Sequence, residues 1–195
     1  MINVQEIHLL QSANIKNWHD NVILTQVELP WKFIEENNMW NFLLWHEEDL
    51  ARIIEIDPFE IVKAKRNIDR YNQARNNSIE DIDQWILNYL VTNGVNSQGA
   101  LHSETPGMMI DRLSIMQLKI FHMEEETTRL NATEDHSLQC KKKVLILNEQ
   151  IQDLSDCLPA VLKLISSGGL KFKIYRQFKM YNDPSLNPQL YNRKQ

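Results

Sequence analysis

Apolar residues recur every three or four positions over most of this chain, the spacing that places them on one face of an α-helix. The pattern predicts four clear helical stretches, over 31–54, 57–91, 105–121 and 137–166. A further helix, or two short ones, is expected over 3–21. We therefore predict an all-α protein, a bundle of about five helices of which two or three are long.

The breaks between these stretches carry ordinary helix-boundary signals. Asp57 and Thr105 each precede a proline, which is typical of an N-cap residue followed by proline in the first helical turn. Residues 93–105 form a polar loop with two glycines, and Gly168 with Gly169 ends the last long helix.

Composition agrees with a single helical domain over residues 1–195. The chain has only 5 glycines and 6 prolines, fewer turn residues than a sandwich or barrel of this length needs. Hydrophobic residues make up 43% and charged residues 24%, which separates the chain from the disordered class. Residues 170–195 alternate basic and aromatic side chains at first, so we predict a short C-terminal segment docked on the bundle, followed by a tail.

Charge and cysteine content exclude several classes of function. The net charge of −5 argues against general nucleic-acid binding, which needs a basic face. The two cysteines, Cys140 and Cys157, fall in one predicted helix and would lie roughly 25 Å apart at about 1.5 Å per residue, too far to pair. Without a disulfide framework, a signal-peptide pattern or a transmembrane segment, we expect a cytoplasmic protein.

The most informative stretch is the polar run over 65–76, inside the predicted 57–91 helix. Lys65, Asn72 and Arg75 occupy positions of the helix seam where apolar residues normally stand. Asp69 and Asn76 follow Lys65 and Asn72 by one helical turn, so they belong to the adjacent stripe of the same side. This departure from the apolar pattern indicates a site or a buried polar network.

Two more polar groups stand out on neighbouring helices. His46 and Asp49 follow a strongly apolar stretch. Asp111, Arg112 and Lys119 interrupt a helix that is apolar on nearly every side and that we expect to be the most buried element. Buried charges are costly unless they are paired, so these side chains need partners. The candidate ligand-binding residues are therefore His46, Asp49, Lys65, Asp69, Asn72, Arg75, Asn76, Asp111, Arg112 and Lys119.

Two interpretations of this set remain open. In the first, the arginines and lysines hold a phosphate or carboxylate of a small molecule, while His46 or the aspartates orient it or transfer protons. In the second, the charges form ion pairs that fix how the helices pack. The sequence identifies no catalytic residue and no cofactor, and it leaves open whether the protein is an enzyme.

A metal site is a third interpretation, which we do not adopt. His46 and Asp49, joined by Asp69 or Asp111, would suit a hard divalent cation. The sequence lacks both a His-Glu-x-x-His motif and the repeated Glu-x-x-His pairs of di-metal bundles. We therefore predict no metal ligands.

Several motifs together resemble a bacterial family classed as a domain of unknown function. They are Leu-Trp-His-Glu-Glu-Asp over 44–49, Ile-Asp-x-x-Asn-Gln-x-Arg-Asn over 68–76, Thr-Pro-Gly-x-x-Ile-Asp-Arg-Leu-Ser-Ile over 105–115, and Lys-Met-Tyr-Asn-Asp-Pro over 179–184. The resemblance covers roughly residues 40–191. It implies a bacterial protein whose relatives are often encoded near glycosyltransferases of cell-envelope polysaccharide assembly.

Combining residues and resemblance gives two functional expectations. The first is a cytoplasmic helical protein of envelope polysaccharide synthesis, of the lipopolysaccharide type, that binds a phosphorylated or carboxylated small molecule. The alternative is a non-catalytic adaptor or oligomeric partner of a glycosyltransferase, whose charged cluster is structural. The expected partners are accordingly a small anionic ligand, a glycosyltransferase or a second copy of the chain, without nucleic acid.

Overall fold

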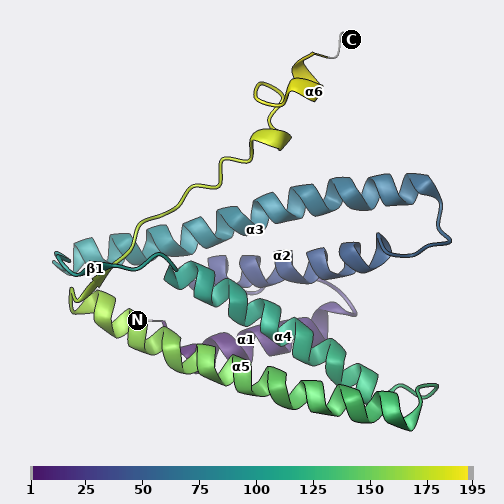
Figure 1. The fold of residues 1–195 in the computed structure, drawn as a ribbon. Helices are drawn as coiled ribbons and strands as arrows, with labels where there is room; N and C mark the ends of the chain where they lie inside the picture. Colours follow the sequence, from purple (N-terminus) through teal and green to yellow (C-terminus); the bar gives the residue numbers. More distant parts are fainter. Residues whose placement is uncertain (1, 193–195) are drawn as a thin grey trace.

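Five long helices follow one another along the chain in the computed structural model, which describes residues 2–192 (Figure 1). They are α1 (Val4–Trp18), α2 (Trp31–Leu50), α3 (Pro58–Thr92), α4 (Pro106–Thr128) and α5 (Glu134–Ser166). The predicted all-α fold class is confirmed. The predicted tail extends to residue 195, and its last three residues lie outside the described part of the chain.

Helices α3 and α4 begin at the capping residues that the sequence predicted. Asp57 accepts a hydrogen bond from the backbone N–H of Phe59 at 2.9 Å, and Pro58 is the first residue of α3. Thr105 accepts from the N–H of Met108 at 3.2 Å before Pro106 begins α4. In both cases the cap satisfies an N–H that has no partner within the helix.

Some boundaries differ from the prediction. Helix α2 ends at Leu50, short of the predicted residue 54, because the chain must turn before Pro58 can begin the antiparallel α3. Helix α4 continues to Thr128, beyond the predicted residue 121, as an extension of half-buried and exposed residues. Charged residues over 124–126 are compatible with an exposed helix, so they do not mark its end.

A short parallel strand pair, which the sequence did not predict, closes one end of the molecule. Strand β1 (Ala100–Leu101) lies in the predicted loop and pairs with β2 (Leu170–Lys171), with Ala100 opposite Leu170. The two chains approach closely at Gly99, where an added Cβ would lie 2.1 Å from the carbonyl oxygen of Gly169. Two-residue strands are too short to show an alternating pattern, so nothing in the sequence announces them.

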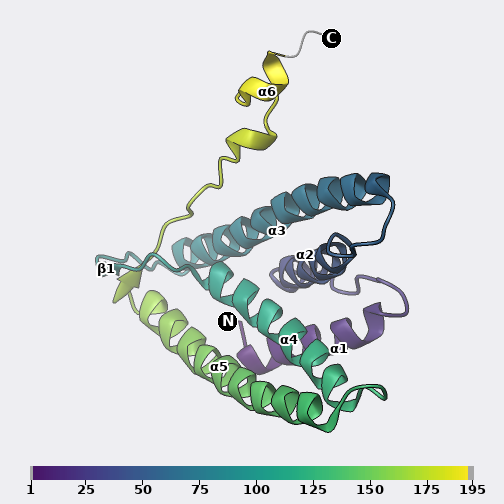
Figure 2. The ribbon, with the colours of Figure 1, turned by 45° about the vertical axis from the view of Figure 1, so that its right-hand side comes forward.

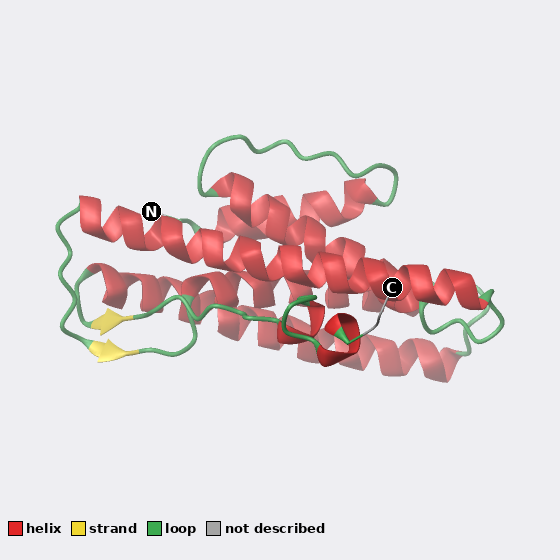
Figure 3. Cartoon of the chain, turned by 90° about the horizontal axis from the view of Figure 1, so that it is seen from above, coloured by secondary structure: helices red, strands yellow, loops and turns green. Residues whose placement is uncertain are grey.

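Helix α4 holds the bundle together. It packs against α1, α2, α3 and α5, whereas α2 and α3 form one helical hairpin and α4 and α5 another. Figure 1 shows α4 crossing between the two sides of the bundle, and Figure 2 shows the same arrangement after a turn. Seen from above in Figure 3, the strand pair lies at one end of the helices. This central position gives α4 helical neighbours on several sides, which agrees with apolar residues on nearly every side of its first four turns.

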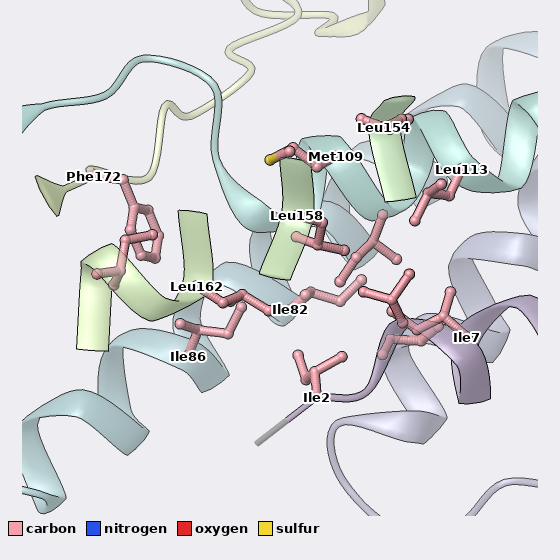
Figure 4. Close-up of a cluster of buried hydrophobic side chains, with 14 of the residues drawn as sticks. Ile2, Ile7, Ile82, Ile86, Met109, Leu113, Leu154, Leu158, Leu162 and Phe172 are labelled. Atoms are coloured by element: carbon pink, nitrogen blue, oxygen red, sulfur yellow. The ribbon is translucent and has the colours of Figure 1, made fainter. Parts of the chain in front are cut away.

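The main core lies where α1, α3, α4 and α5 meet. Its largest fully buried members include Ile7, Ile82, Leu113 and Leu158, each 0% exposed. Figure 4 shows all four labelled around the same centre, with Phe172 toward the strand end. A second apolar cluster lies between α1, α2 and α4 and consists of Ile15, Trp18, Phe42 and Leu118. The polar run over 65–76 belongs to neither cluster.

The C-terminal segment crosses α3 after β2. Glu80 of α3 accepts a hydrogen bond from Arg176 Nη1 at 2.6 Å and another from the backbone N–H of Gln177 at 3.2 Å. The chain then continues into η1 (Met180–Asn182) and α6 (Pro188–Tyr191), which lie outside the bundle of α1–α5 in Figures 1 and 2. Asn182 and Leu190 also line a surface pocket together with residues of α3 over 69–77.

Candidate functional site

Amide side chains of α2 form a buried polar network with α4. Asn37 and Asn41 both donate to Asp111 Oδ1, at 3.0 and 2.9 Å. Asn38 and Asn41 also donate to the hydroxyl of Ser114, at 3.0 and 3.2 Å. All five residues are buried. Their mutual hydrogen bonds offset the cost of removing polar groups from water and fix the register of α2 against α4.

Helix α3 joins this network through Ser78 and Arg75. Ser78 accepts from Asn37 at 3.3 Å and donates to the carbonyl of Arg75 at 2.7 Å. Arg75 Nε lies 4.0 Å from Asp111 Oδ1, an ion pair that is too long for a hydrogen bond. One guanidinium nitrogen, Nη2, donates to Asn72 at 3.0 Å, while the buried Nε has no hydrogen-bond partner. The guanidinium is therefore held in place with unused donor capacity.

A cavity of about 440 Å³ opens beside Arg75, between α2, α3 and α4. Its polar lining residues are Asn41, Trp45, Glu48, Asp49, Arg52, Asn72 and Arg75, and its apolar ones are Leu44, Ile68, Ile115 and Leu118. The volume is within the range of small-molecule sites. Apolar walls with a few polar groups converging on one region are also typical of such sites.

The charges of the lining are only partly matched. Glu48 and Arg52 pair with each other at 2.7 Å, one turn apart on α2. Lys179 is a second cation near Arg75. Burial lowers the pKa of Lys179, the charge of Arg75 lowers it further, and Asp69 opposes both. An added anion near Arg75 would relieve this repulsion.

A smaller cavity of about 190 Å³ lies on the other side of Arg75. Asn76, Asp83 and Asp111 line it, and Tyr175 of the C-terminal segment lines it as well. Arg75 thus stands between two cavities, and the segment after β2 covers one of them. The C-terminal segment is a structural part of this region and not a separate appendage.

The structure brings about half of the predicted site residues together. Asp49, Asn72 and Arg75 line the larger cavity, Asp111 reaches Arg75 through the buried network, and Asn76 lines the smaller cavity. These residues come from α2, α3 and α4. The polar positions in the seam of α3 are those that face the two neighbouring helices.

The other predicted residues point elsewhere. Lys65 pairs with Asp69 along the exposed side of α3. Arg112 pairs with Glu104, and together with Lys119 it lines a separate cavity against α5. Successive residues of a helix project about 100° apart, so Arg112 cannot share the direction of Asp111. The shared site proposed from the sequence does not include these side chains.

His46 lies in a different cluster, among aromatic rings. Its ring contacts Phe42 at 4.5 Å between centroids, and it also contacts the rings of His19 and His122. Burial lowers the pKa of His46, the neighbouring charges of His19 and His122 lower it further, and Asp49 opposes the change. His19 and His122 belong to no motif in the sequence, so their proximity to His46 was not predicted.

The sequence analysis also missed the asparagines of α2. Asn37, Asn38 and Asn41 lie among apolar residues, and Asn37 and Asn41 are one helical turn apart. Asn37 and Asn41, two amides one turn apart in an apolar helix, could have indicated a buried polar network.

The model of one protein family, described as a protein of unknown function (DUF4254), matches residues 31–174. The chain belongs to the DUF4254 family. The match begins at the first residue of α2 and ends shortly after β2, so it includes α2, α3 and α4 with the whole of the larger cavity. Membership confirms the resemblance to a family of unknown function.

No curated protein and no solved structure matches the DUF4254 chain. Among the helices of residues 2–192, none combines the length and the apolar character that crossing a membrane requires.

Proposed function

We propose that this DUF4254 protein binds a small anionic molecule that also carries hydroxyl groups, in the cavity between α2, α3 and α4. The observation that carries the proposal is the state of Arg75. Its guanidinium is anchored by Asn72, and its Nε is buried without a hydrogen-bond partner. A phosphate or carboxylate oxygen accepts charge-assisted hydrogen bonds from such a group.

The remaining lining suits the rest of such a ligand. Asn41, Asn72 and Asp49 offer amide and carboxylate groups, which bind hydroxyls as donors or acceptors. Trp45 and Leu44 offer apolar surface on the same cavity. A phosphorylated or carboxylated sugar combines the three features, because it has an anionic group, hydroxyls and an apolar ring face.

The proposed ligand class agrees with the context that the family resemblance implies. Sugar phosphates and nucleotide sugars are the cytoplasmic intermediates from which glycosyltransferases build envelope polysaccharides. We place the DUF4254 protein at this stage, as a cytoplasmic protein that binds one of these intermediates.

Thermal-shift measurements with sugar phosphates, nucleotide sugars and inorganic phosphate test the proposal. A ligand that binds only the folded state raises the melting temperature. We expect at least one sugar phosphate to stabilise the wild-type protein, and we expect Arg75→Ala to abolish that shift. Arg112→Ala is the matched control, because Arg112 is an exposed arginine that lines a different cavity. It is expected to keep the full ligand response.

Two results would contradict the proposal. One is an absence of stabilisation of the wild-type protein by every ligand of these classes. The other is a ligand response that Arg75→Ala retains at wild-type size. Strong destabilisation by Arg75→Ala without any ligand effect would favour the structural interpretation, in which Arg75 and Asp111 only fix helix packing.

Exposed apolar residues around the turn between α2 and α3 favour a second candidate function. In this function the protein is an adaptor that binds a glycosyltransferase, or it associates with a second copy of the chain. Ile54 is 97% exposed and Phe59 68%. Exposed apolar side chains gathered on one part of a surface are typical of interaction sites. Loss of glycosyltransferase capture, or of self-association, in Ile54→Asp with Phe59→Asp would support this function, and unchanged association would contradict it.

A further inference from the structure

Three histidines, two of them in helices and one just after a helix, meet in the bundle. His19 immediately follows α1, His46 lies in α2 and His122 in α4. Their ring centroids are 5.2, 5.4 and 5.7 Å apart, and one potential ligand atom from each lies within 4.8 Å of the others. Among residues 2–192 this is the only group of three or more histidine, cysteine or acidic side chains with such geometry.

In two of these rings, hydrogen bonds determine which nitrogen is free to bind a metal ion. His19 Nδ1 lies 2.7 Å from the carbonyl oxygen of Ile15, and His122 Nδ1 lies 2.8 Å from Glu125 Oε2. Both partners are acceptors, so in each ring the proton is on Nδ1 and Nε2 has a free lone pair. A histidine whose Nδ1–H donates to a carboxylate or carbonyl while Nε2 binds a metal is the usual arrangement in metalloproteins.

The nitrogens that would bind the metal lack other partners. Nε2 of His46 and Nε2 of His122 are both buried without a hydrogen bond. A buried nitrogen without a partner costs free energy, and structures contain few of them. Two such nitrogens occur in adjoining rings of residues that could ligate one ion, and a bound cation would satisfy both.

The surroundings suit a bound cation of intermediate softness. Phe121 stacks on His19 and Trp45 stacks on His122, each with centroids 4.8 Å apart, so the polar nitrogens are surrounded by apolar rings. Such a shell limits water and strengthens coordination. His19 is on the exposed side of the group, which leaves room for a water molecule as a further ligand.

We propose that His19, His46 and His122 bind one Zn²⁺ ion through their imidazole nitrogens, with Glu125 positioning His122. Three imidazoles suit zinc better than they suit magnesium or calcium, which prefer oxygen ligands. In a tetrahedral zinc site with Zn–N bonds of about 2.0–2.1 Å, ligand nitrogens lie about 3.3 Å apart. The three potential ligand atoms, within 4.8 Å of one another, would have to move closer by side-chain rotation to reach that spacing. The arrangement of three histidines and one open position is that of zinc sites which activate water.

This site is independent of the proposed sugar-phosphate site. None of the three histidines lines the cavity beside Arg75, although Trp45 contributes to both places. The residues differ from the metal set considered from the sequence, which combined His46 with aspartates. In the structure Asp111 is committed to the asparagine network instead.

Metal titration of the full chain tests the inference. The protein is treated with a chelator, and Zn²⁺ is added in competition with a chromophoric chelator. We expect one Zn²⁺ per chain. Titration with Co²⁺ reports the ligands, because tetrahedral nitrogen coordination gives intense visible absorption, whereas sulfur ligation adds a near-ultraviolet charge-transfer band. We expect the visible bands without the sulfur band.

Single substitutions assign the ion to the three rings. His19→Ala removes an exposed residue outside the helix, so it tests binding without disturbing the core. We expect His19→Ala and His122→Ala each to weaken Zn²⁺ binding by about 100-fold or more. Glu125→Gln, which changes a residue that positions His122, should weaken it by about 10-fold. His102→Ala is the matched control, because His102 lies near β1, outside the cluster. It should leave the affinity unchanged.

Three results would overturn the inference. The first is an absence of stoichiometric Zn²⁺ binding by the wild-type chain. The second is binding that His19→Ala leaves at wild-type affinity. The third is a cobalt spectrum with a sulfur charge-transfer band, which would place the ion at Cys140 or Cys157.

Discussion

Asn41 of α2 donates a hydrogen bond of 2.9 Å to Asp111 of α4, and the contact lies directly beside the candidate ligand cavity. The same carboxylate oxygen accepts from Asn37 and faces Arg75. Three helices are thus fixed to one another by a single side chain. The region that positions Arg75 for a ligand is also the region that determines how α2, α3 and α4 pack.

Replacing Asp111 by alanine is expected to destabilise the protein by about 2–4 kcal/mol, because it removes a shared acceptor of two buried amides and the counter-ion of the Arg75 guanidinium. Urea denaturation monitored by circular dichroism measures the change. Arg112→Ala is the control, since its exposed ion pair with Glu104 is expected to contribute less than about 0.5 kcal/mol. Equal effects from the two substitutions would contradict the assigned role of Asp111.

Gly107 allows the first turn of α4 to lie directly on α3. A Cβ at this position would lie 2.6 Å from the carbonyl oxygen of Ile79 and 2.8 Å from Asp83 Oδ1. Because the nearest obstacle is backbone, Gly107→Ala should destabilise the protein by about 1–3 kcal/mol. At Gly169 an added Cβ meets its nearest atom at 3.5 Å, so Gly169→Ala should change stability by less than about 0.5 kcal/mol. Thermal denaturation of both variants makes the comparison.

Asp83 makes stability depend on pH. Burial raises its pKa to about 6, with a further contribution from the charge of Glu80, while hydrogen bonds from Thr105 and the backbone N–H of Gly107 oppose the rise. A carboxyl group with a raised pKa binds more protons in the folded state, so its contribution decreases as pH rises from about 4 to about 6. The free energy of unfolding of the wild type, relative to Asp83→Asn, should therefore fall between pH 4 and pH 7.

The expected size of this change is on the order of 2–3 kcal/mol, from about 1.36 kcal/mol per pKa unit. Taking the difference between wild type and Asp83→Asn at each pH removes the contributions of the other titrating groups. A difference that stays constant from pH 4 to pH 7 would show that Asp83 titrates as an ordinary exposed carboxyl. Chemical denaturation at four or five pH values is sufficient.

The fold could be predicted from the sequence largely because its signals are local. Asp57 with Pro58 and Thr105 with Pro106 mark helix beginnings through contacts within one turn. The pairing of Ala100 with Leu170 depends instead on where two distant loops meet, so no local pattern reports it. The end of α2 at Leu50 is similarly set by the need to reverse the chain before α3.

The site could be predicted only in part, for a related reason. Polar residues in the seam of α3 indicated correctly that Asn72 and Arg75 face neighbouring helices. Which helix faces which depends on rotations about the helix axes, and these rotations send Arg112 away from Asp111. The contact between His19 and His122 joins residues that are far apart in the sequence, so only the three-dimensional structure reveals it.

Glu35 holds the connection between α1 and α2 through a buried carboxylate. Its Oε2 accepts from the backbone N–H groups of Thr25 and Gln26, at 2.8 and 2.7 Å, and its Oε1 accepts from Asn14 at 3.3 Å. Glu35→Ala should destabilise the protein by about 3 kcal/mol, because hydrogen bonds to a charged acceptor are strong and the loop has few others. Hydrogen exchange provides the specific measurement, since the amides of Thr25 and Gln26 should exchange at least about 10-fold faster. Glu36→Ala changes the partly exposed neighbouring position and should leave both amides protected. If the two amides stay equally protected in Glu35→Ala, the Glu35 carboxylate does not hold the loop.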